Sequence, residues 1–178
     1  MLGLRWRGLD GGCGMTGLFR EGAPVSCPPR GQDRSPRRWP YENAQSFGPY
    51  DSTVPTARTH TRVVLAEWGL AHVSTAAELV LSELVTNALQ ATWRLGMHTP
   101  VSVRLLADHS WLVVEIWDGV QAAPVLREPD TARELADDEA DGHGNGLVIV
   151  ATMCHRWGFF RRPEGGKVVY AIFALQEP

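Results

Sequence analysis

The order of its periodic segments is the feature that most constrains how this chain can fold. From about residue 50, apolar residues recur at helical spacing through two segments and then follow strand-like patterns over 101–107 and 110–118. After a long loop come a third helical segment and a final pair of strand-like segments. Short turns join the strands of each pair, so both pairs are expected to be antiparallel hairpins. The sequence therefore predicts an α+β fold in two layers, with helices packed on one face of a mostly antiparallel sheet.

The first fifty residues show no such periodicity. They hold nine of the 18 glycines, six of the 12 prolines and seven arginines against four acidic residues. A segment of this composition buries too little apolar surface to offset its chain entropy. We therefore expect a disordered N-terminal extension over 1–49 and one folded domain over 50–178.

Composition narrows the class of protein further. The formal net charge of −3 argues against a nucleic-acid partner held by general phosphate attraction. Three cysteines without a CxxC pair form neither a disulfide framework nor a four-ligand zinc site. There is no signal-peptide core and no apolar run of the roughly 20 residues that a membrane span needs. We expect a cytoplasmic protein that does not contact membranes, and we attribute the sixteen arginines against the single Lys167 to high-GC codon usage.

Start and stop signals bound the expected elements. The first helix should have Pro55 in its first turn and end at Gly69. The second should begin at Thr75, which has capping-box spacing to Glu78, and should run to Leu95 before Gly96. The remaining expected features are a two-residue turn at Asp108–His109, a short helix around 130–137, a glycine-led helix from GNGLVIVATMC and a turn at Pro163–Gly166.

Two polar residues of the second helix stand out. Its apolar stripe consists of Val80, Leu81, Leu84, Val85 and Ala88. Glu83 and Asn87 are four residues apart, so they share one side of the helix at the edge of that stripe. A polar pair there could line a cleft, or it could be a solvated glutamate beside an asparagine without a role; the pattern alone leaves both readings open.

Two glycine-containing sites follow. Asp118 and Gly119 come directly after a strand, which is typical of a ligand contact at the rim of a sheet and equally of an ordinary turn. Gly142, Gly144 and Gly146 alternate at the entry to an apolar helix, where backbone N–H groups could bind an anion or a phosphate. A flexible loop is the competing interpretation. The spacing matches neither the Rossmann nor the P-loop motif.

Taken in this order, the three sites resemble the GHKL ATPases, and most closely their anti-sigma-factor serine/threonine kinase branch. SELVTNAL is similar to the N box of that branch, WDG to its adenine-binding box and GHGNGL to its ATP-lid glycine box. The closing segment HRWGFFRRPEGGKVVYAIF looks like its final hairpin. The resemblance covers residues 50–178 and implies a Bergerat-type sandwich.

The resemblance also implies roles for individual residues. Asn87 matches the position that holds the Mg²⁺ bridging the phosphates of ATP, and Glu83 matches the general base. Asp118 matches the acceptor of the adenine amino group. The other residues implied to bind the nucleotide are Gly119, Gly142, Gly144, Asn145, Gly146 and Leu147. The implied partners are a small antagonist protein that receives the phosphate and a sigma factor that competes for the kinase, and the resemblance is compatible with a homodimer.

Three positions depart from the pattern of the branch. Ala91 replaces a common histidine, Val120 stands where the adenine box often has glycine, and Val168 stands where a threonine often follows GGK. These departures keep a second function open, a protein-binding module whose nucleotide only sets partner affinity. A self-contained ATP hydrolase is a third possibility. His143 and His155 have no partners at metal-ligand spacing, so we expect no metal site at either.

Overall fold

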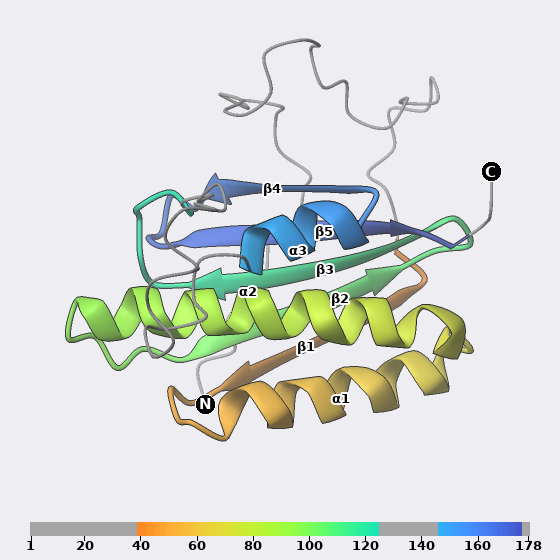
Figure 1. Cartoon of the computed structure of the whole chain (residues 1–178), viewed down its shortest axis with the longest axis horizontal. Helices are drawn as coiled ribbons and strands as arrows, with labels where there is room; N and C mark the ends of the chain where they lie inside the picture. Colours follow the sequence, from red (N-terminus) through yellow and green to blue (C-terminus); the bar gives the residue numbers. More distant parts are fainter. Residues whose placement is uncertain (1–38, 125–145, 176–178) are drawn as a thin grey trace, which may run out of the picture. The chain divides into compact units, whose positions relative to one another are not determined.

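The computed structural model describes residues 39–124 and 146–175, all of which belong to one compact unit, 39–178. Five strands form one antiparallel sheet in the order β1-β2-β3-β5-β4. The helices α1, α2 and α3 cover one face of this sheet (Figure 1). The predicted α+β two-layer architecture is therefore confirmed for the described residues. None of the helices in these ranges is long and apolar enough to cross a membrane.

Most element boundaries fall close to the predicted ones. The helices are α1 (Thr53–Glu67), a 3₁₀ turn (Ala71–Val73), α2 (Ser74–Arg94) and α3 (Gly146–Met153). The strands are β1 (Tyr41–Phe47), β2 (Val101–Ala107), β3 (Trp111–Asp118), β4 (Arg156–Arg161) and β5 (Lys167–Ala174). Gly69 and Gly96, both with positive φ, follow α1 and α2 as predicted, since glycine adopts that conformation readily.

Strand β1 corrects the predicted start of the folded domain. Residues 41–47 lie in the stretch that we expected to be disordered, yet they pair with β2 along their whole length. Tyr41 lies against Trp68, with ring centroids 5.6 Å apart, and Asn43 makes a 2.8 Å hydrogen bond with His60 of α1. Because this edge strand is polar, its sequence lacks the alternation of apolar residues from which a strand is predicted. Residues 1–38 lie outside the described ranges.

Two local predictions are wrong in detail. No capping box forms at Thr75: α2 begins at Ser74, and Glu78 instead accepts a hydrogen bond from the Ser74 hydroxyl and pairs with Arg62. The β2–β3 connection is one residue longer than the predicted turn, because the Asp108 carboxylate accepts from the backbone N–H groups of Ser110 and Trp111, so that β3 begins at Trp111.

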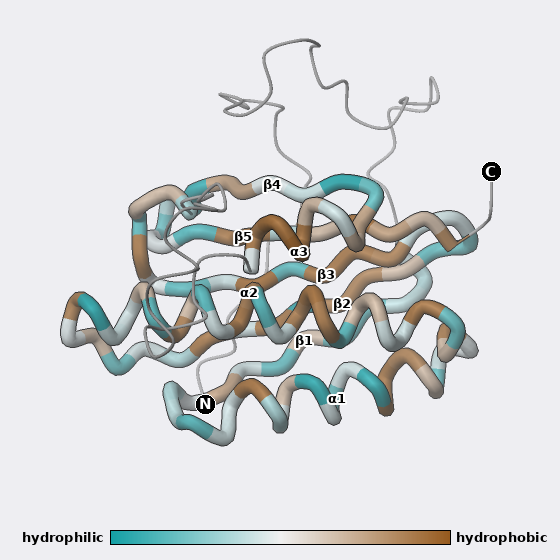
Figure 2. Tube along the Cα trace, viewed as in Figure 1, coloured by the Kyte–Doolittle hydropathy of each residue, from teal (hydrophilic) through white to brown (hydrophobic). Residues whose placement is uncertain are grey.

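The core lies between the helices and the sheet. The predicted stripe of α2 is buried, from 0 to 3% exposed, and packs with alternate residues of the strands. In Figure 2 the hydrophobic segments gather in α3 and the central strands, whereas α1 is mixed. Leu112, Val114 and Ile116 of β3 belong to this core, so alternation places Asp118 on the same, helix-facing side of the sheet.

Candidate functional site

Glu83 and Asn87 lie one turn apart on α2, and both are half-buried. The amide nitrogen of Asn87 is buried and has no hydrogen-bond partner among the described residues. Leaving a buried polar group unpaired costs about 1–3 kcal/mol. The Asn87 amide, which offers a donor at one end and an acceptor at the other, is therefore suited to a polar ligand.

The start of α3 packs directly against this pair. A Cβ added at Gly146 would lie 2.6 Å from Glu83 Oε2 and 3.5 Å from Asn87 Nδ2, so a side chain there would displace the carboxylate. Leu147 and Val150 are buried and anchor α3 on the core. The structure thus brings together three predicted site residues from two elements that are distant in sequence. A helix N-terminus beside them offers unpaired N–H groups to an anion.

Asp118 forms the second part of the site, at the end of β3. Its side chain is 1% exposed, and Oδ1 accepts hydrogen bonds from the Val120 backbone N–H at 2.8 Å and from Lys167 Nζ at 2.9 Å. Burial raises the pKa of the Asp118 carboxyl, an effect that the ammonium of Lys167 opposes. The carboxylate is therefore held by specific donors and does not project into solvent as in an ordinary turn.

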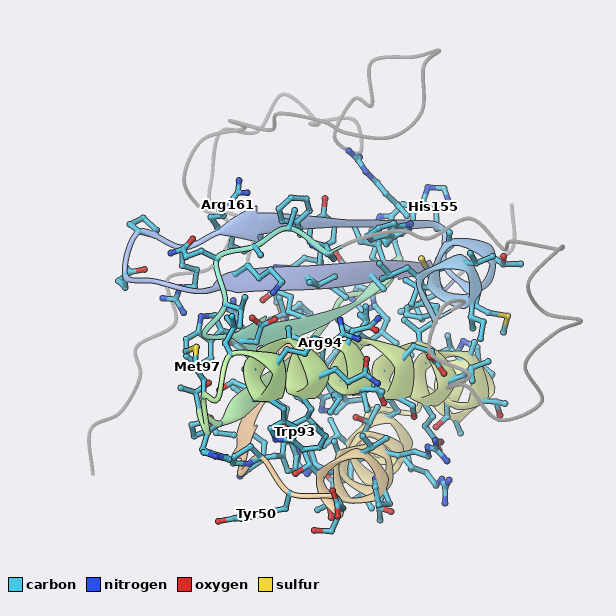
Figure 3. The ribbon with its side chains drawn as sticks, turned by 60° about the vertical axis from the view of Figure 1, so that its left-hand side comes forward. Tyr50, Trp93, Arg94, Met97, His155 and Arg161 are labelled. Carbon is cyan, nitrogen blue, oxygen red and sulfur yellow. The ribbon has the colours of Figure 1, made fainter. Side chains whose placement is uncertain are left out.

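Gly119 lies against the loop that follows α2. A Cβ at Gly119 would lie 3.1 Å from Thr99 Oγ1 and 3.3 Å from Met97 Cε, so these two segments of the chain approach each other closely. Figure 3 shows Met97 in that loop, beyond the end of α2. Thr99 Oγ1 is buried and, like the Asn87 amide, has no partner among the described residues. Sequence analysis did not identify Thr99, because a lone hydroxyl in a loop carries no periodic signal.

The rest of the predicted glycine box lies outside the described ranges. Gly142, Gly144 and Asn145 fall within 125–145, as do His143 and the short helix expected around 130–137. The structure therefore neither supports nor opposes the roles predicted for these residues. His155, which is described, lies against Trp111 with ring centroids 5.0 Å apart and ring planes tilted by 48°.

Lys167 is part of the site, although its being the single lysine in an arginine-rich sequence gives no sign of this. Its side chain is buried and paired with Asp118, so codon usage does not account for it. Val168, which the family pattern singled out, pairs with Trp117 in the register of β3 and β5. Successive residues of a strand point to opposite faces, so Lys167, and not Val168, shares a face with Asp118. Only the β3–β5 pairing reveals this contact.

The residues of the site could bind a cation only together with a ligand, such as a phosphate group, that supplies most of the coordinating oxygens. Within the described residues, no cluster of three or more His, Cys, Asp or Glu side chains could enclose a metal ion. Mg²⁺ commonly uses one or two protein oxygens together with water and phosphate oxygens. The buried Asn87 amide fits such a site, since its oxygen could supply one protein ligand.

Comparison with known proteins identifies the family of this chain. Residues 50–173 match the family described as the histidine kinase-like ATPase domain. Among solved structures, one chain of the SiaB–SiaC complex from Pseudomonas aeruginosa is similar at 17% identity, with a TM-score of 0.49 over 72% of this chain and 88% of that chain. No curated protein matches.

The family match spans both parts of the site, from α1 through α2 and β3 to β5. It confirms the resemblance inferred from the three boxes. Members of this family bind ATP, usually with Mg²⁺. This chain belongs to the histidine kinase-like ATPase family.

Proposed function

We propose that this protein binds Mg²⁺-ATP and transfers the γ-phosphate to a serine or threonine of a small antagonist protein, as a kinase of the anti-sigma-factor type. The observation that carries the proposal is the close approach of Gly146 to Glu83 and Asn87, where Asn87 Nδ2 is buried and has no hydrogen-bond partner among the described residues. This arrangement joins a carboxylate, a polar ligand group and a helix N-terminus in one place. Phosphoryl transfer requires chiefly this kind of positioning and charge stabilisation.

The nucleotide would span the two parts of the site. Asn87 would hold Mg²⁺ on the phosphates, and the backbone around Gly146 and Leu147 would contact the phosphate oxygens, with Gly142, Gly144 and Asn145 completing the lid. Asp118 would accept a hydrogen bond from the adenine amino group, and Gly119 would let the backbone after β3 lie close to the loop that carries Thr99, beside the base. The bound Mg²⁺ would supply charge neutralisation at the phosphates.

Glu83 is the proposed general base. Its carboxylate has no hydrogen-bond partner among the described residues, so it is available to a substrate hydroxyl. It would take the proton of the serine or threonine hydroxyl while that oxygen attacks the γ-phosphorus. The bond from this phosphorus to the bridging oxygen breaks, and ADP leaves with the electron pair.

The second candidate is a protein-binding module in which nucleotide sets the affinity for a partner without turnover. The departures at Ala91 and Val168 favour it, because the branch commonly has a histidine and a threonine at these positions, beside the proposed phosphate and adenine contacts. Val120 is buried, and its backbone N–H serves Asp118, so the glycine usual in this box is replaced without loss of that hydrogen bond. Both candidates require the same nucleotide site and differ only in the role of Glu83.

Nucleotide binding is tested first, by calorimetry of the full chain with ATP and with ADP, with and without Mg²⁺. Asp118→Asn should weaken ATP binding about tenfold, since losing a hydrogen bond to the ligand costs about 1–3 kcal/mol. Asn87→Ala removes the proposed protein ligand of Mg²⁺ and should weaken Mg²⁺-dependent ATP binding by about the same factor. Thr75→Ala, at an exposed position on the same helix, is the matched control and should bind like the parent. Normal affinity in both site variants would refute the assignment.

The chemistry is tested with Glu83→Gln, which keeps the shape of the side chain and removes its charge. With radiolabelled ATP and a candidate antagonist protein, transfer should fall by about 10²–10⁴-fold while ATP affinity stays within a few-fold of the parent. Normal transfer by the variant would show that Glu83 is not the base. No transfer by the parent, with partner affinity still dependent on nucleotide, would support the binding module.

A further inference from the structure

A buried ion pair lies on the helix-facing side of the sheet, at the base end of the proposed nucleotide site. Asp118 and Lys167 are direct cross-strand partners of β3 and β5, and their side chains are 1% and 5% exposed. Lys167 Nζ donates to Asp118 Oδ1 at 2.9 Å and to the Val120 carbonyl at 3.3 Å. The Val120 N–H donates to the same Oδ1 at 2.8 Å. One oxygen of the carboxylate therefore receives both donors.

The other oxygen of this carboxylate, Oδ2, differs from Oδ1 in its hydrogen bonding. Among the described residues, no donor forms a hydrogen bond to Asp118 Oδ2. Two donors on Oδ1 restrict rotation of the carboxylate and leave Oδ2 as an acceptor in a defined direction. The ion pair thus orients the group that is proposed to meet the base.

The backbone holds Lys167 in this position. Gly166 has φ +76°, and a Cβ there would collide with the carbonyl oxygen of Asp118, so the β4–β5 turn lies directly on the end of β3. Trp117 Nε1 donates to the Gly165 carbonyl at 3.3 Å and adds a second link between the turn and β3. Lys167 is the next residue after this turn, so its Cα has little freedom to move away from Asp118.

We propose that Lys167 is a positioning residue for base recognition: it keeps Asp118 ionised with Oδ2 directed at the nucleotide, and the site thereby selects purines with a 6-amino group over those with a 6-oxo group. This inference rests on the proposed function. A carboxylate only accepts hydrogen bonds, so it suits the amino group of adenine and repels the carbonyl oxygen of hypoxanthine. A protonated carboxyl group can also donate, and it would reduce this discrimination.

The charge balance around Asp118 depends on Lys167. Burial raises the pKa of Asp118, and the charged group that acts against this effect is the Lys167 ammonium on β5. The other contribution comes from the uncharged backbone N–H of Val120, and among the described residues no further ionisable group contributes to the shift of this pKa. Removing the ammonium should therefore move the protonation of Asp118 toward neutral pH.

The test compares ATP with ITP, which carries the 6-oxo base, by calorimetry with Mg²⁺ at pH 6, 7 and 8. The full-length parent should prefer ATP by about tenfold or more, with an ATP affinity that is flat across this range. Lys167→Met should bind ATP less tightly at pH 6 than at pH 8 and should lose most of its preference over ITP. Lys167→Arg, which keeps the positive charge, should restore both properties.

Arg161→Met is the matched control. Arg161 pairs with Lys167 in the register of β4 and β5, but it is exposed and donates to the Gln121 carbonyl (Figure 3). Losing this nearby surface charge should leave both the ATP:ITP ratio and the pH profile as in the parent. Thermal melts of every variant show whether the domain remains folded.

The outcomes distinguish failure of the proposed function from failure of the role proposed for Lys167. If the parent binds no ATP, the proposed function fails. If the parent binds ATP but Lys167→Met keeps its selectivity and its flat pH profile, the role of Lys167 is refuted while the function stands. Should Lys167→Met not fold, Lys167→Gln removes the charge and keeps a donor. If neither variant folds, the pH dependence of ATP affinity in the parent is the test. A flat dependence from pH 6 to pH 8 together with a preference over ITP would support the proposal, and a several-fold loss of ATP affinity at pH 6 would overturn it.

Discussion

At the scale of single residues, Gly146 is where a small change should separate function from stability. Gly146→Ala places a methyl group 2.6 Å from Glu83 Oε2, the flexible end of a side chain that can move aside. Alanine also favours helices by about 1 kcal/mol over glycine, so the melting temperature should not fall. We expect phosphate transfer to drop about tenfold or more as Glu83 is displaced.

The check on Gly146→Ala is a paired measurement of thermal unfolding and of transfer from labelled ATP. Thr152→Ala, in the exposed last turn of the same helix, is the control, and it should leave transfer unchanged. An unchanged transfer rate in Gly146→Ala would mean that the contact between α3 and Glu83 has no part in the chemistry.

At the scale of elements, the β4–β5 turn contains a natural pair of glycines for comparison. Gly165 and Gly166 both have positive φ, but a Cβ at Gly165 meets nothing within 4 Å, whereas one at Gly166 meets the backbone of Asp118. Substitution by alanine should cost about 1–2 kcal/mol of backbone strain at either position. Gly166→Ala adds the collision, so its free energy of unfolding should fall by clearly more. Urea titration of both variants measures the difference, and equal losses would show that the turn does not press on β3.

Strand β1 leads to a prediction about truncation. Deleting residues 1–48 removes its seven pairings with β2 and the ion pair between Glu42 and Arg104, at 2.9 Å. It also makes β2, which carries Arg104, the new edge strand of the sheet. A chain that begins at Trp39 keeps all of these contacts. We therefore expect the urea midpoint of the shorter chain to lie well below that of the chain from Trp39. Equal midpoints would show that β1 contributes nothing to stability.

At the scale of the whole molecule, carboxyl groups with pKa shifts of opposite sign shape how stability depends on pH. Glu115 and, in the same direction, Asp118 have a raised pKa, whereas Glu78 has a lowered one. Burial raises the pKa of Glu115, so the folded state takes up this proton before the unfolded chain does, and lowering the pH from 7 stabilises the fold. The hydrogen bond from Arg62 lowers the pKa of Glu78 below its usual 4.5, so stability is lost as the pH falls below that value. The second effect should be modest because Arg62 is exposed.

Urea midpoints measured from pH 7 down to pH 3 should therefore pass through a maximum on the acid side of neutrality. Glu115→Gln should flatten the rise, because the residue no longer titrates, and Glu78→Gln should reduce the fall at the acid end. A midpoint that declines steadily from pH 7 in the parent, with no effect of Glu115→Gln, would contradict this account.

Features that depend on one element at a time were predictable from the order of the amino acids. Apolar spacing identified the buried stripe of α2, and glycines marked the ends of α1 and α2. Helical geometry alone placed Glu83 and Asn87 on one side of α2. The order of the three boxes then indicated the family. These features were predictable because a helix or a hairpin is encoded by residues within a few positions of one another.

Contacts between elements that are distant in sequence became known only from the folded structure. Polar β1 is a strand because β2 and α1 lie beside it, and its own residues give no strand pattern. Gly146 reaches Glu83 because α3 packs on α2, and Lys167 reaches Asp118 because β5, not β4, pairs with β3. The periodicity of a segment shows which face it buries but not its neighbour across the core. That neighbour depends on packing and on chain closure over many residues, which no local pattern encodes.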